Sequence, residues 1–456
     1  MTKSLGLCIQ YLDADANVKV RALALIELRQ GTADAIAESI FDYLAASSLD
    51  QERLVGGACD GASVMVGPLT GVVARIKVKI PTFLATHCVA HRLSLAAVDA
   101  CSGSAIVSRF QSIINEIYSF FSRSTVHTSQ LREIEKAIND PQLKMTRATE
   151  TRWLSHQMAV DALRRSIKAV KLVMEQEAAT GNATALGLSL YLQKPTFIAT
   201  MLVLSDILSI LGNLSRCFQS KSLNLLSVED LVRDCKSALG ELKEFPLQGG
   251  YARELNDVLV SMQISETLQA DSFVQQMQSY IGKLIDNLEH RFPQLHLISL
   301  FGYLDPRNVH LATPVAINEL AEHFELDGAQ LWSEYLIFKS FVKNLSVPSE
   351  VTPTEAVSSA ILGSSNRGTM STLFPLISDL LARLVVLPAS SAHVERVFSS
   401  MKRIKTAQRN RLNTSTLDHL IRVSMEGPTV QEWDPIPALR IWESWGNRKL
   451  ETSSKV

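Results

Sequence analysis

The first hundred residues alternate between short β-rich runs and runs of helical period. The β-rich runs 4–12 and 18–26 flank Asp-Ala-Asp-Ala-Asn, whose short polar side chains favour a turn, so the pattern predicts a β-hairpin. Thr32 is placed to cap a helix with apolar residues at helical spacing. Short strands are predicted at 54–59 and 83–88, and a helix follows the second. This segment is therefore expected to be an α/β unit.

A helical period takes over at residue 104 and dominates to about residue 342. Residues 344–372 are rich in Ser, Pro, Thr and Gly, which predicts a linker or mobile loop. A second apolar helical stretch begins at Phe374 and is broken by Pro388, after which Ser390 or Ser391 can cap another helix. The predicted units are 1–152, 153–373, 374–427 and a tail, 428–456.

Composition indicates an ordinary globular chain. Hydrophobic residues make up 46% and charged residues 20%, which argues against disorder. The net charge of -1 gives no global field to attract nucleic acid, so any basic site must be local. The six cysteines form no CxxC pair and no apolar signal segment opens the chain, which predicts a reduced, intracellular protein. The most apolar stretch, 197–211, is interrupted by Ser205 and Asp206 and is short for a membrane span, so no membrane association is expected.

Few residues stand out as candidate chemistry. Asp60 ends a predicted strand before Gly-Ala-Ser, where α/β folds often place a functional carboxylate, although a turn-forming role is the simpler interpretation. His87, Cys88 and His91 have the ligand types of a zinc site but no second pair nearby, so a buried Cys with hydrogen-bonded His is favoured. Trp153 is typical of a core anchor.

Acidic and basic residues in the C-terminal part have equally plain interpretations. Glu395, in the predicted helix after Pro388, is typical of a solvated or salt-bridged residue. The densest basic run can contact phosphates but is equally typical of a solvated helix face; it comprises Lys402, Arg403, Lys405, Arg409 and Arg411. The chain has no GxxxxGK[ST], GxGxxG, GxSxG or HExxH motif, so ATP-binding, dinucleotide-binding, hydrolase and zincin functions lack support.

An ordered set of motifs nevertheless resembles the hAT transposase superfamily across nearly the whole chain. The set is C-D-G-A-S-V-M at 59–65, H-C-V-A-H-R-L at 87–93, E-T-R-W at 150–153, L-D-P-R at 304–307, and S-A-H-V-E-R-V-F-S followed by R-N-R-L at 409–412. It is most similar to the domesticated, zinc-finger-associated relatives found in vertebrate genomes. The resemblance implies an RNase H-like α/β core interrupted by a large all-α insertion, with a C-terminal dimerisation segment, in a protein that is mainly helical overall.

The resemblance also implies roles for particular residues. Family transposases hold two divalent metal ions with two Asp and one Glu, and Asp60 and Glu395 match the second Asp and the Glu. Arg152 and Trp153 match a DNA-contacting motif of the insertion, and Cys88 and His91 match a pair near the active site. The first catalytic Asp and the family's zinc finger have no matching position, so no complete metal site is expected, and the 4–12 strand should have an unpaired edge.

The favoured hypothesis is therefore a catalytically inactive, domesticated transposase-like protein acting as a dimerisation or interaction module in the nucleus. It needs no cofactor, binds nucleic acid weakly at most, and forms a homodimer or binds protein partners through 374–425. The apolar residues there are expected to form the interface or to complete the core: Leu376, Ile377, Leu380, Leu384, Val385, Leu417, Leu420 and Ile421. The alternative is an active or residual DNA transposase or nuclease using Mg²⁺. A weaker alternative is a nucleic-acid-binding regulator without chemistry.

Overall fold

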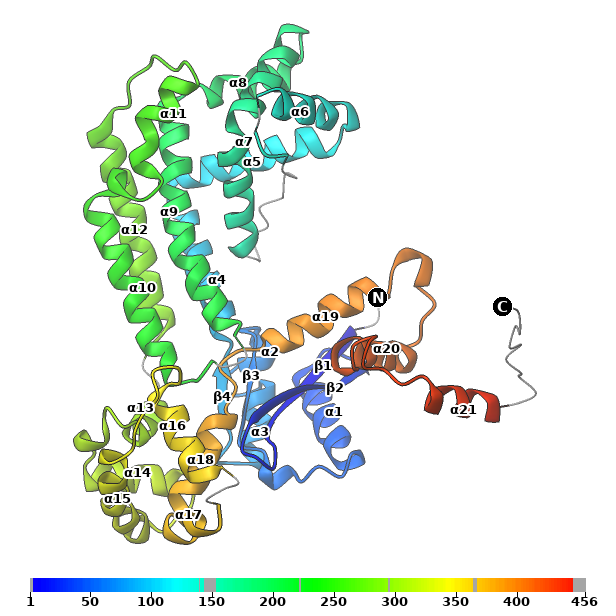
Figure 1. The fold of residues 1–456 in the computed structure, drawn as a ribbon, viewed down its shortest axis with the longest axis vertical. Helices are drawn as coiled ribbons and strands as arrows, with labels where there is room; N and C mark the ends of the chain where they lie inside the picture. The colour runs from blue at the N-terminus through cyan, green and yellow to red at the C-terminus, as the bar shows by residue number, and fades with distance from the viewer. Residues whose placement is uncertain are drawn as a thin grey trace.

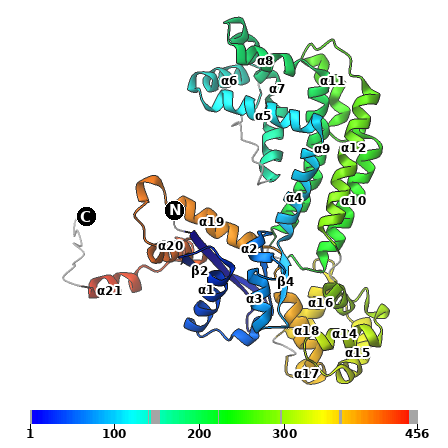
Figure 2. The same ribbon diagram turned by 180° about the vertical axis from the view of Figure 1, so that it is seen from behind.

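The fold is mainly helical, with 69% of the chain in helices and two two-stranded sheets (Figure 1). The computed structural model describes residues 3–138, 140–142, 153–220, 223–293, 296–363 and 367–445, without the side chains of 153–155 and 367. An N-terminal α/β unit lies at one end of a long helical rod, and the C-terminal helices return to that unit (Figures 1 and 2).

The predicted hairpin is present. β1 (Lys3–Leu12) pairs antiparallel with β2 (Val18–Leu28), and the Asp13 side chain stabilises the turn by accepting hydrogen bonds from the backbone N–H groups of Asp15 and Asn17 at 3.0 and 2.9 Å. Thr32 caps α1 (Ala33–Ala46), as expected. Among the described strands β1 pairs with β2 alone, so its other edge has no strand partner.

The second sheet joins two short parallel strands through a helical connection. β3 (Gly56–Cys59) and β4 (Leu84–His87) are linked through α2 (Ser63–Val66) and α3 (Val72–Lys79), and α4 (Val89–Ser102) follows. Both strands are shorter than predicted. A turn of 3₁₀ helix, η1 (Gln51–Arg53), precedes the first.

The helical region begins at residue 105, as the period predicts. Figures 1 and 2 show α9, α10 and α12 side by side in the rod, which leads from α5–α8 to the α/β unit. The α-helices are α5 (Ala105–Ser122), α6 (Thr125–Ala137), α7 (Trp153–Ala179), α8 (Ala183–Leu192), α9 (Pro195–Phe218), α10 (Ser227–Glu244), α11 (Leu255–Ser261), α12 (Ala270–Arg291), α13 (His296–Phe301), α14 (Pro314–His323) and α15 (Gly328–Lys343). Short 3₁₀ turns join them at η2 (Pro246–Gln248), η3 (Ala252–Glu254), η4 (Gly302–Leu304) and η5 (Val309–Leu311).

The most apolar stretch belongs to a longer helix than the sequence predicted. Ser205 and Asp206 do not interrupt α9, which runs for 24 residues and has the length and hydropathy of a membrane-crossing helix. However, 78% of its apolar window is buried inside the fold. Packing in the core of the rod therefore accounts for the apolar character of this helix.

The prediction of a loop over 344–372 is also wrong in its second half. Residues Pro353–Leu362 form α16 and Arg367–Leu373 form α17. Thr352 and Glu355 form a capping box at the start of α16, and Val357 and Ile361 are buried. The Ser, Thr and Pro residues that suggested a loop therefore include the start signal of a helix.

The C-terminal helices are α18 (Pro375–Val386), α19 (Ala392–Ile404), the 3₁₀ turn η6 (Ala407–Arg409), α20 (Thr414–Glu426) and α21 (Ile436–Ser444). Two of them, α19 and α20, share a core with the N-terminal hairpin. Leu25 of β2 packs with apolar residues of α19 and α20. Along β2, the backbone N–H groups of Ala22 and Leu25 donate to the carboxylates of Glu426 and Asp418 at 2.9 and 2.7 Å. Helix α20 thus covers this sheet edge with acceptors, which blocks pairing with another strand.

Candidate functional site at the ends of β3 and β4

Asp60 follows directly from the end of β3. Its exposed carboxylate accepts a hydrogen bond from the backbone N–H of Ala62 at 3.3 Å, a local turn of the kind that the simpler interpretation predicted. Gly61 lies against the His87 ring so closely that a Cβ at this position would come within 2.5 Å of it. A glycine here therefore allows Asp60 and the end of β4 to lie side by side.

Cys88 fastens the start of α19 to this strand end. Its side chain is 0% exposed, and its Sγ accepts a hydrogen bond from the backbone N–H of Ser391 at 3.3 Å and lies 3.6 Å from Ser390 Oγ. The neighbouring N–H of Val89 donates to Ala389 O at 3.1 Å. The buried-cysteine interpretation fits these contacts, because the thiol stabilises the junction of two distant segments.

Glu395 lies in the first turn of α19, and a series of hydrogen bonds links this turn to the strand end at Asp60. The backbone N–H of Glu395 donates to Ser391 O, that of Ser391 to Cys88 Sγ, and that of Cys88 to Cys59 O at 2.8 Å. Three hydrogen bonds thus connect the backbone that carries Glu395 with the residue before Asp60. Both carboxylates are exposed.

The two histidines of the motif lie together but differ in environment. Their rings are 5.5 Å apart, and His87 Nε2 is buried without a hydrogen-bond partner, so the prediction of a hydrogen-bonded histidine is wrong for this atom. Burial, then the charge of Arg92 and the neighbouring His91, lower the pKa of His87 to about 4, so its ring is neutral near pH 7. Within the described part of the chain no three His, Cys, Asp or Glu side chains are placed to hold a metal ion, so the zinc interpretation finds no support.

The other predicted site residues are not part of this cluster. The basic run begins in the last turn of α19 with Lys402 and Arg403 and continues between α19 and α20 with Lys405, Arg409 and Arg411. All five are exposed, and none has a carboxylate partner among the described residues. They are free to meet phosphate or solvent. Arg152 lies outside the described residues, and so does the side chain of Trp153, the first residue of α7.

Two features were not predicted from the sequence as functional. Asp305 is 1% exposed and accepts hydrogen bonds from Arg307 and, at 3.0 Å, from Thr354 Oγ1. The pair belongs to the L-D-P-R motif, and its contacts are structural because they hold η4 against α16. The other feature is Arg92, which follows His91 in the sequence. Its guanidinium has no ion-pair partner among the described residues, and this depends on which segments pack opposite it in the fold.

Comparison with known families identifies the C-terminal part of the chain. Residues 367–425, from the start of α17 almost to the end of α20, match the model of the hAT family C-terminal dimerisation region. We call this matched segment, residues 367–425, the hAT region. The match is consistent with a hAT transposase-derived protein and supports self-association.

The hAT region contains Glu395 and the basic run, and much of its apolar surface serves its own chain. Five of the eight apolar residues predicted for an interface or for the core are buried in the core: Ile377, Leu380, Leu384, Leu417 and Ile421. An interface of the hAT region must therefore use other side chains.

Proposed function

We propose that the protein is a catalytically inactive, hAT-derived module that self-associates through its C-terminal helices. The match of 367–425 to the hAT dimerisation region carries this proposal. A nuclear location and weak nucleic-acid binding through the basic run, residues 402–411, are part of the same proposal.

The surface that supports this proposal is a series of exposed apolar side chains on α20, on α21 and on the residues between and after them, which we call the C-terminal patch. Helix α21 has no buried residue and lies away from the rest of the chain (Figures 1 and 2). The patch consists of Val423, Val430, Trp433, Ile436, Ile441, Trp442 and Trp445, with Val423 70% and Trp445 73% exposed. Clusters of exposed aromatic and aliphatic side chains mark interaction surfaces, and this one continues directly from the hAT region.

We propose that the protein lacks catalysis because it has too few carboxylates in place to hold two metal ions. In two-metal phosphoryl transfer, the metal ions stabilise both the attacking and the leaving oxygen. The family resemblance implies three acidic residues that hold these ions, and Asp60 and Glu395 match two of them. The four described strands carry one acidic residue, Glu27, which accepts a hydrogen bond from Thr414 of α20 at 2.7 Å. Two exposed carboxylates would hold a single ion weakly.

Light scattering on the full chain tests the self-association. At about 50 µM the wild-type protein is expected to be a dimer, since a standard interface holds at that concentration. A W433A/I441A/W445A variant should be monomeric. As a matched control, L336A/I337A removes two exposed apolar side chains of α15 and should remain dimeric. A monomeric wild-type protein would refute the proposed function.

A residual nuclease is the second candidate, favoured by the hydrogen bonds that bring the Asp60 and Glu395 segments together. Incubation with Mg²⁺ or Mn²⁺ and DNA carrying candidate transposon ends tests it, with Asp60→Ala alongside. We expect no cleavage. Nicking or hairpin formation that disappears in the variant would show that the protein is an enzyme.

A further inference from the structure

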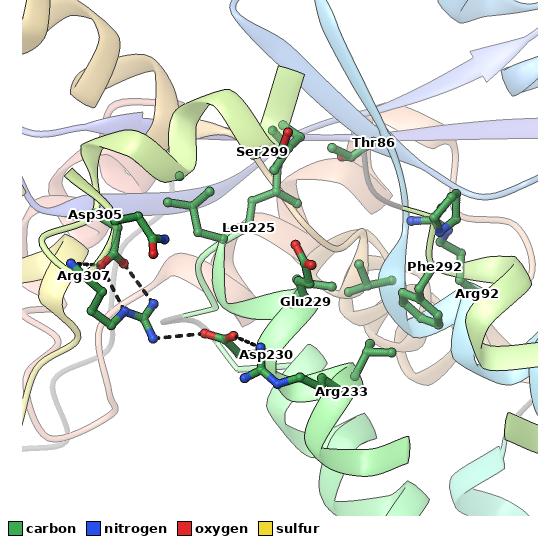
Figure 3. Close-up of a pocket in the computed structure, with 18 of the residues that line it drawn as sticks. Thr86, Arg92, Leu225, Glu229, Asp230, Arg233, Phe292, Ser299, Asp305 and Arg307 are labelled. Carbon is green, nitrogen blue, oxygen red and sulfur yellow. Dashed lines mark hydrogen bonds and ion pairs between the residues drawn. The ribbon is translucent and has the colours of Figure 1, made fainter. Parts of the chain in front are cut away.

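A cleft of about 810 Å³ lies where the helical rod meets the α/β unit (Figure 3). Thr86, His87, Val89 and Arg92 line one side; α10, the end of α12 and the 298–311 segment line the other. The volume suits a small-molecule ligand. None of its lining residues belongs to the hAT region or to α21, so ligand binding there can be tested independently of the proposed function.

Charged side chains of the cleft wall largely neutralise one another. Arg307 bridges two carboxylates, lying 3.1 Å from Asp230 and 2.9 Å from Asp305 (Figure 3). Lys236 pairs with Glu289. These contacts fix the wall opposite α4 without any need for a ligand.

Arg92 has no such partner among the described residues. Its guanidinium carbon lies 5.1 Å from the centre of the Phe292 ring, and the adjacent Arg291 is itself paired with Asp99. Burial, and then the charge of Arg291, lower the pKa of Arg92. A half-buried cation without a counter-charge costs free energy, which an anion in the cleft would recover.

Two further features suit a phosphate group in this cleft. Arg92 stands in the first turn of α4, where the helix dipole adds positive potential to that of the guanidinium. The planar guanidinium fork also matches two oxygens of one phosphate. Between the charged side chains, the lining also includes apolar and aromatic residues: Leu225, Val228, Val232, Phe292, Ile298 and Leu311.

We propose that this cleft binds a phosphate monoester on an aromatic body, of mononucleotide size, with Arg92 as the principal phosphate contact. The phosphate can belong to a free nucleotide or to the end of a nucleic-acid strand, since both present the same group.

Calorimetric titration of the full chain with AMP, inorganic phosphate and a 5′-phosphorylated oligothymidine separates these sources. AMP is expected to bind saturably. Arg92→Gln should weaken binding about tenfold or more, because a charge-assisted contact is lost, and Arg92→Lys should lie between. Arg53→Gln, which alters an exposed arginine outside the cleft, should bind like wild type.

Thermal unfolding supplies a second readout. Without ligand, Arg92→Met should melt at or above the wild-type temperature, and AMP should raise the melting temperature of the wild-type protein only. Binding of the oligonucleotide but not AMP, if lost in Arg92→Gln, would support the site and assign the phosphate to a strand end. No saturable binding of any probe up to about 5 mM, or equal binding by Arg92→Gln, would overturn the proposal.

Discussion

Asp206, within α9, holds the turn around residue 251 against the rod. Its carboxylate accepts hydrogen bonds from the backbone N–H groups of Tyr251 and Ala252 at 2.9 and 3.0 Å, although burial raises the pKa of Asp206. Asp206→Ala leaves both donors unsatisfied and is expected to lower the free energy of unfolding by about 2–4 kcal/mol. Asp206→Asn should cost less because its amide oxygen still accepts one bond. Urea unfolding followed by circular dichroism measures both; an alanine variant as stable as wild type would contradict this account.

At the same scale, His87 should make stability depend on pH. Its pKa is about 4 in the fold and 6.5 ordinarily, so between these values the unfolded chain binds a proton that the folded chain does not. The contribution of His87 to the free energy of unfolding is complete above pH 6.5 and is lost as the pH falls toward 4. Between pH 7 and 5 the wild type should lose about 1–2 kcal/mol more than His87→Asn, allowing for solvent screening. Parallel stability curves of the two proteins would rule this out.

At the scale of elements, α16 depends on its capping box. Thr352 Oγ1 accepts the N–H of Glu355 at 3.3 Å, and the Glu355 carboxylate accepts the N–H of Thr352 at 2.8 Å. Thr352→Ala is expected to lower the free energy of unfolding by about 1 kcal/mol. Ser415→Ala, at an exposed position in the first turn of α20, is a matched control that should change little. Equal effects of the two substitutions would mean that the cap is not what stabilises α16.

At the scale of the whole molecule, the net charge of -1 predicts weak and nonspecific binding to duplex DNA. The contacts would come from the exposed basic run, and neutralising Arg409 and Arg411 should reduce affinity equally for all sequences. Raising salt from about 50 to 200 mM should weaken binding steeply, because phosphate contacts release counterions. Fluorescence anisotropy with unrelated duplexes measures this. Sequence-selective binding in the nanomolar range at physiological salt would contradict it.

The sequence by itself determined those features of the fold that depend on residues close together in the chain. The hairpin turn at Asp13, the cap at Thr32 and the helical period from residue 105 were all predictable, because side-chain periodicity and capping act over a few positions. The same local rules misread 344–372, where Ser, Thr and Pro serve a helix start as readily as a loop. Motif resemblance selected Asp60 and Glu395 but could not place them.

Only the tertiary structure decided which distant segments meet. Cys88 and Ser391 are 303 positions apart, and their hydrogen bond joins the strand end that precedes α4 to the helix that carries Glu395. Arg92 likewise lies against an aromatic ring only because Phe292, at the end of α12, is folded next to the first turn of α4. Contacts of this kind leave no local period, since each side chain alone is compatible with many surroundings and long-range packing selects one of them.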